Sequence, residues 1–116
     1  MISKHFDESE ATCRCGCGQC IINTALVGLL EAIRARFMQP VTVYSWNRCE
    51  DWNSQVGGVP NSFHVQGTAC DISIENVPLG EIAEEAERVG ADGIGIYLGQ
   101  GFVHVDCRQY PARWTE

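Results

Sequence analysis

The sequence predicts a small α+β domain in which an antiparallel sheet carries helices packed on one side. Three observations lead to this class: two segments with apolar residues at helical spacing, four short segments typical of strands, and a glycine turn between two of those strands. At 116 residues the chain is long enough for one hydrophobic core. We therefore expect a single domain over residues 1–116, in which residues 1–20 are an irregular, cysteine-rich lead-in.

The first half of the chain contains one strong helix signal. Apolar residues recur at intervals of three and four over residues 26–37, which predicts an amphipathic helix. Asn23 or Thr24 caps this helix at its start, and Pro40 ends it. The β-branched and aromatic residues at 41–44 then predict a strand.

The second half alternates between short helices and strands. Residues 49–56 are expected to form a short helix, and residues 69–74 alternate enough to form a strand. Residues 78–89 predict a second amphipathic helix, with glutamates on the side that faces water. The segments 93–98 and 102–107 flank a glycine turn, which predicts an antiparallel hairpin.

Composition and charge narrow the possible partners. The formal net charge of −7 argues against nucleic acid, whose phosphates require clustered lysines and arginines. No apolar stretch approaches the roughly 20 residues that a membrane-spanning helix needs. The first residues have no apolar signal core, so we expect synthesis in the cytoplasm without a cleaved leader. We also expect the protein to be a monomer.

Three side chains indicate the chemistry. His64, Asp71 and His104 supply two imidazoles and a carboxylate, the ligand set of a hydrolytic zinc site with one coordination position left open. Taken singly, each has an ordinary explanation as a loop, capping or strand residue. Together they come from a loop, the strand after it and the last hairpin, so they can converge on one cleft. Zinc held in this way activates a water molecule and polarises a carbonyl group.

The surrounding motifs resemble a known family. The pattern Ser-x-His-x-x-Gly-x-Ala-x-Asp at residues 62–71, with Phe-Val-His-Val-Asp at 102–106, is similar to the zinc D-alanyl-D-alanine carboxypeptidase family. That family shares its fold with the hedgehog signalling domain and includes phage endolysins that cut peptidoglycan stem peptides. The resemblance extends from about Phe6 to Trp114.

The resemblance implies roles for individual residues. His64, Asp71 and His104 fall at the positions of the zinc ligands. Arg48 falls where the family places an arginine that hydrogen-bonds the substrate carbonyl and the developing oxyanion, a donor that acts in the transition state. Ser62 falls where a hydroxyl group contacts the substrate.

The chain departs from the family pattern at the general base. Several relatives carry an acid or a histidine shortly before the last zinc-binding histidine, and this chain has none there. Asp106 is the nearest acid and lies two residues beyond His104, on the same face of the predicted strand. Asp106 is therefore either the general base or a residue that orients a metal ligand.

Seven cysteines are many for this length. Four of them crowd into one short segment: Cys13, Cys15, Cys17 and Cys20. They can bind a second metal ion, form disulfides or remain free, and in the first two cases they would hold the lead-in against the domain. We interpret Cys49, Cys70 and Cys107 as ordinary small buried residues.

These observations predict a zinc metallopeptidase that hydrolyses peptidoglycan stem peptides. D-Ala-D-Ala carboxypeptidase and L-Ala-D-Glu endopeptidase activity use the same metal chemistry, and the sequence leaves both open. The alternative is a non-catalytic, zinc-containing module that binds or strengthens the cell wall, which the missing acid before His104 favours. Action on the cell wall after release, from a phage or a bacterium, would follow in either case.

Overall fold

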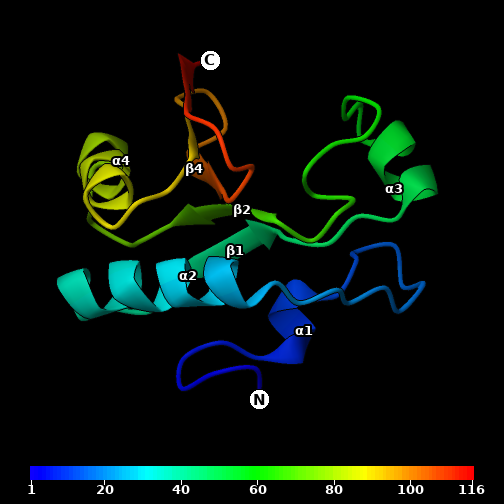
Figure 1. The fold of residues 1–116 in the computed structure, drawn as a ribbon, viewed down its shortest axis with the longest axis horizontal. Helices are drawn as coiled ribbons and strands as arrows, with labels where there is room; N and C mark the ends of the chain where they lie inside the picture. The colour runs from blue at the N-terminus through cyan, green and yellow to red at the C-terminus, as the bar shows by residue number, and fades with distance from the viewer.

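The computed structural model describes residues 1–116 and contains five strands and four helices (Figure 1). The strands are β1 (Thr42–Ser45), β2 (Ala69–Ser73), β3 (Gly93–Tyr97), β4 (Phe102–Asp106) and β5 (Ala112–Thr115). The helices are α1 (Glu8–Ala11), α2 (Thr24–Phe37), α3 (Glu50–Gln55) and α4 (Leu79–Arg88). The sheet order is β1-β2-β4-β3-β5, so the predicted α+β class is confirmed.

The sheet separates a hydrophobic core from a polar face. Successive side chains of a strand point to opposite faces, so Cys70 and Ile72 of β2 enter the core while Asp71 faces the other way. In β4, Val103 and Val105 are fully buried in the same core. In Figure 1, α2 and α4 lie on one side of the molecule and α3 lies on the other, across the strands.

Helix α2 matches its sequence signals closely. The Asn23 side chain caps it by accepting a hydrogen bond from the backbone N–H of Leu26 at 3.0 Å. Met38 ends it in the left-handed conformation, two residues before Pro40. Its buried face consists of the apolar residues that repeat at helical spacing: Leu26, Leu29, Leu30 and Ile33.

The lead-in is more ordered than predicted. It contains α1, and it contributes Phe6 and Ala11 to the core. The buried side chain of Asn47 fastens it by donating to the carbonyl groups of Ala11 at 2.8 Å and Ile21 at 3.0 Å. The Asn47 side chain also accepts from the backbone N–H of Ile21 at 2.9 Å. Residues 1–20 are therefore built into the domain.

One strand was missed by the sequence analysis. Strand β5 pairs with β3 in parallel, whereas all other neighbours in the sheet are antiparallel. It has only four residues at the edge of the sheet and none of them is fully buried, so the apolar signal is weak. None of the four helices has the length and apolar character needed to cross a membrane.

Candidate metal centre

Three predicted ligands meet on the polar face of the sheet. Asp71 of β2 and His104 of β4 lie directly opposite each other in the antiparallel register, so their side chains share a face. The loop after α3 brings His64 to the same place. Nε2 of His64 lies 3.2 Å from Oδ1 of Asp71, and Nδ1 of His104 lies 3.1 Å from the same oxygen. All three side chains are buried.

The second ring nitrogen of each histidine has a hydrogen-bond acceptor. Nδ1 of His64 lies 3.0 Å from the carbonyl oxygen of Trp46, and Nε2 of His104 lies 2.7 Å from Oδ2 of Asp106. A carbonyl or a carboxylate can only accept, so these two nitrogens carry hydrogen. In the neutral rings, the lone pairs therefore sit on the nitrogens that face Asp71, as metal coordination requires.

The spacing of the donor atoms fits a small tetrahedral cation. With ligand bonds of about 2.0–2.1 Å, adjacent ligand atoms of a tetrahedral zinc site lie about 3.3–3.4 Å apart. The observed separations from Asp71 Oδ1 are 3.2 Å to His64 and 3.1 Å to His104. Two lone pairs and a carboxylate at this distance repel one another unless a cation or protons lie between them. The donor set thus fits a divalent metal ion.

Protons compete with a metal for this position. Burial alone would raise the pKa of Asp71, but hydrogen bonds from His104 and His64 outweigh it and lower the pKa to about 2. Burial alone would lower the pKa of His104, but the carboxylates of Asp106 and Asp71 outweigh it and raise the pKa. Asp71 is therefore ionised at neutral pH, and His104 is the group whose proton a metal ion must displace.

Asp106 is fully buried and fully engaged. Besides His104, it accepts from the backbone N–H of Gly93 at 3.0 Å and that of Arg108 at 3.1 Å. The guanidinium group of Arg108 donates to both carboxylate oxygens over 2.7–3.1 Å. Burial would raise the pKa of Asp106, but His104 and Arg108 hold it well below its usual range. These contacts suit a residue that orients His104, and they leave little of the carboxylate available as a general base.

Two glycines make room for these side chains. A Cβ at Gly93 would lie 2.2 Å from the carboxylate of Asp106, and one at Gly95 would lie 2.3 Å from the Trp114 ring. Gly95 is paired with His104 on one side and with Trp114 on the other. The indole ring therefore lies across Gly95, with its centroid 5.2 Å from that of His104.

Arg48 is held beside the three ligands. Its Nη2 lies 3.6 Å from Oδ2 of Asp71, while Nη1 donates to Asn53 at 3.1 Å and Nε to Ser45 at 3.2 Å. Its backbone N–H donates to the carbonyl group of His64 at 3.1 Å. The side chain is largely buried, so its charge is fixed in position. Arg48 thus presents a fixed cationic donor beside the three predicted ligands.

Ser62 has a local structural contact as well as a place in the cleft. Its Oγ accepts the backbone N–H of His64 at 3.2 Å, which shapes the loop that carries this histidine. The residue is buried and also lines the cleft. Ser62 therefore lines the cleft that contains the ligands and helps to position His64, and its contact with substrate stays a prediction.

A cleft of about 520 Å³ opens over the three ligands. Its walls include three side chains that were not predicted from the sequence, Tyr97, Phe102 and Arg108, together with Trp114. Arg108 lies over the Phe63 ring, 4.5 Å from its centroid, and 5.1 Å from that of Trp114. Tyr97 stacks on Phe102 with centroids 4.8 Å apart. No local pattern identifies these residues, because their partners are distant in the sequence.

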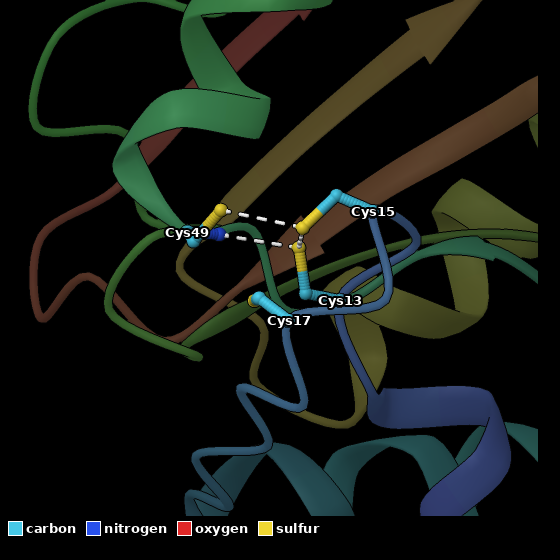
Figure 2. Close-up of side chains that lie close together, drawn as sticks. All are labelled: Cys13, Cys15, Cys17 and Cys49. Carbon is cyan, nitrogen blue, oxygen red and sulfur yellow. Dashed lines mark hydrogen bonds between the residues drawn. The ribbon is translucent and has the colours of Figure 1, made fainter.

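The structure gathers a second set of ligand-type residues, and its membership differs from the prediction. The four sulfur atoms within 4.8 Å of one another belong to Cys13, Cys15, Cys17 and Cys49 (Figure 2). Cys20 lies outside this group and packs against the hydrophobic core. Cys49, interpreted from the sequence as a buried filler, stands at the start of α3 and takes the fourth place. The short segment alone could not surround one centre with four sulfurs.

Comparison with known proteins agrees with the geometry. The family model described as Peptidase M15 matches residues 4–106, so the chain belongs to the Peptidase M15 family. This is the class that the fold and the His/Asp set define.

The curated relatives have a more particular description. The chain is 35% identical over 80 residues to the peptidoglycan L,D-endopeptidase MepK of Escherichia coli strain K12, which covers 65% of this chain and 43% of that protein. It is 40% identical over 50 residues to a probable peptidoglycan L,D-endopeptidase MepK of Haemophilus influenzae, which covers 43% of this chain and 27% of that protein. The matched region spans less than half the length of these relatives.

Proposed function

We propose that the protein is a zinc-dependent peptidase that hydrolyses peptide bonds in peptidoglycan stem peptides. The observation that carries the proposal is the His64–Asp71–His104 set, in which each histidine turns one ring nitrogen toward the carboxylate in a cleft while its other ring nitrogen faces a hydrogen-bond acceptor. Membership of the Peptidase M15 family and similarity to two relatives described as peptidoglycan L,D-endopeptidases support it. Action on the cell wall is part of the same proposal.

Each residue has a part in this chemistry. His64, Asp71 and His104 would hold the zinc ion, which supplies an activated water molecule and a Lewis acid when bound. Arg48 would donate to the carbonyl oxygen of the scissile bond, and it would stabilise the negative charge that develops there. Asp106 would keep His104 in the tautomer that leaves Nδ1 free for the metal.

The bond between an L- and a D-residue is the preferred target within this proposal. Both relatives are described as L,D-endopeptidases, which supports this target over D-Ala-D-Ala carboxypeptidase action. The aromatic side chains Tyr97, Phe102 and Trp114 offer a cleft wall against which peptide backbone can pack.

The test is mass spectrometry of the products released from purified peptidoglycan. We expect cleaved stem peptides with the zinc-loaded protein, and none after chelation or with His64→Ala. His5→Ala is the matched control, since His5 contacts Glu31, neither residue lines the cleft over the ligands, and the loss of His5 should leave the products unchanged. A zinc-loaded protein that releases no peptide would favour the alternative, a non-catalytic cell-wall module.

Arg48→Ala tests the mechanism separately from the metal. We expect turnover to fall by about 10²-fold or more while zinc content is unchanged, as for the loss of an oxyanion donor. Arg36→Ala is the control, because Arg36 is an exposed arginine on α2. Full turnover in Arg48→Ala would remove the proposed role of Arg48.

A further inference from the structure

The four-cysteine cluster has a geometry that points to a common centre. Cys15 Sγ lies 3.5 Å from Cys13 Sγ and 3.6 Å from Cys49 Sγ, and all four sulfurs lie within 4.8 Å of one another. Figure 2 shows the side chain of Cys49 approaching those of Cys13 and Cys15 from the start of α3. The sulfur of Cys15 thus has two sulfur neighbours, which come from different segments of the chain. In two separate disulfides, each sulfur would have one such neighbour.

Backbone N–H groups surround the sulfurs. The N–H of Cys49 donates to Cys13 Sγ at 3.3 Å, and the N–H of Trp52 donates to Cys49 Sγ at 3.4 Å. The N–H of Gln19 donates to Cys17 Sγ at 3.5 Å. Hydrogen bonds to sulfur favour the charged thiolate over the thiol, and the thiolate is the form that binds metals. Three of the four sulfurs therefore accept a hydrogen bond that favours the thiolate, and this observation is independent of the short distances between the sulfurs.

We propose that Cys13, Cys15, Cys17 and Cys49 bind one zinc ion as a closed, tetrahedral site, separate from the centre in the cleft. With zinc–sulfur bonds of about 2.3 Å, the sulfurs of such a site lie about 3.8 Å apart, close to the separations of 3.5 Å and 3.6 Å from Cys15 Sγ to Cys13 Sγ and Cys49 Sγ. Four soft thiolates select zinc over calcium or magnesium. They also leave no position for water, so this ion is structural.

The site would fix the lead-in to the segment that carries Arg48. Cys49 follows Arg48 directly, and Gln19, two residues after Cys17, donates from its side chain to the carbonyl of Arg48 at 2.9 Å and that of Val65 at 3.3 Å. Metal bound here would close a loop between Cys17 and Cys49, which lowers the conformational freedom of both segments. The ion would thereby stabilise the position of Arg48 without touching substrate.

Metal stoichiometry tests the proposal on the intact protein. Protein purified under reducing conditions should contain two zinc ions per chain. Cys17→Ser should contain one, His104→Ala should contain one, and Cys20→Ser should keep two, because Cys20 lies outside the cluster. A single zinc that persists in Cys17→Ser and is lost in His104→Ala would overturn the proposal.

A second measurement avoids variants that fail to fold. When cobalt replaces zinc in the wild-type chain, coordination by thiolates gives intense sulfur-to-metal charge-transfer absorption, and a site of two imidazoles and a carboxylate does not. We expect this absorption in wild type and in His104→Ala, whether or not the protein cleaves peptidoglycan. Its absence, or disulfides among these cysteines in the native protein, would refute the site while leaving the proposed peptidase untouched.

Discussion

Replacing Asp106 with asparagine separates the two roles that the sequence leaves open for this residue. The substitution keeps the size of the side chain and removes its charge. The asparagine would still have one oxygen for the backbone N–H groups of Gly93 and Arg108, but its amide NH₂ would replace Oδ2 and face both the guanidinium of Arg108 and the donor nitrogen of His104. Two donors then point at each other where a charged hydrogen bond of 2.7 Å existed.

Two effects of Asp106→Asn follow from these contacts. Loss of the acceptor for His104 Nε2 should weaken zinc affinity in the cleft by about 10–100-fold. Loss of a buried partner of Arg108 should lower the free energy of unfolding by about 3–5 kcal/mol, the range for breaking a buried ion pair. Turnover at saturating zinc should fall much less than it would if the general base were removed.

The assay is a zinc titration against a chromophoric chelator, combined with urea unfolding and with turnover measured at saturating zinc. Arg108→Gln is a useful comparison, because it removes the same ion pair and leaves the Asp106–His104 contact in place. It should lose stability while retaining most of the zinc affinity. Unchanged zinc affinity in Asp106→Asn, with turnover abolished at full zinc occupancy, would refute the orienting role and make Asp106 the base.

Three further predictions concern the packing at Gly95, the protonation of His104 and the cysteine cluster. Gly95→Ala should destabilise the protein by about 1–3 kcal/mol, since the new Cβ would overlap the Trp114 ring; urea unfolding measures this, and wild-type stability would show that the ring moves freely. Zinc affinity in the cleft should keep rising with pH up to a higher pH than for an ordinary imidazole site, because the raised pKa of His104 lets protons compete with zinc at higher pH. An affinity that does not change between about pH 5 and 8, the range in which histidines usually titrate, would contradict this. Removing metal should speed trypsin cleavage after Arg14, which is exposed between two cluster cysteines, and an unchanged rate would argue that the metal does not order the lead-in.

The local parts of the site were readable from the sequence. The motif at residues 62–71 identified His64 and Asp71, and the alternation in 102–106 correctly placed His104 and Asp106 on one face of a strand. Strand periodicity of two and a dense motif are local signals, so they need no knowledge of the fold.

The remaining parts depend on pairing between distant segments. Cys49 joins the cysteine cluster only because the end of β1 runs past the lead-in, and Trp114 reaches His104 only because β5 pairs with β3 across Gly95. The residues next to Cys49 and Gly95 in the sequence do not indicate that Cys49 lies beside the lead-in cysteines or that Gly95 lies beside Trp114. The hydrophobic pattern predicted that strands exist, but it did not determine which of them are adjacent.

The register between β2 and β4 has a consequence for folding. Asp71 faces His104 in the native pairing, and a slip of one residue would put Val103 or Val105 in that position and turn the imidazole toward the apolar core. A misaligned sheet therefore cannot assemble the His/Asp donor set. A metal ion that binds only the sheet in its native register shifts the equilibrium by mass action toward that register and away from every slipped one. The ion would thus stabilise the native register of β2 and β4 in addition to any chemistry that it performs.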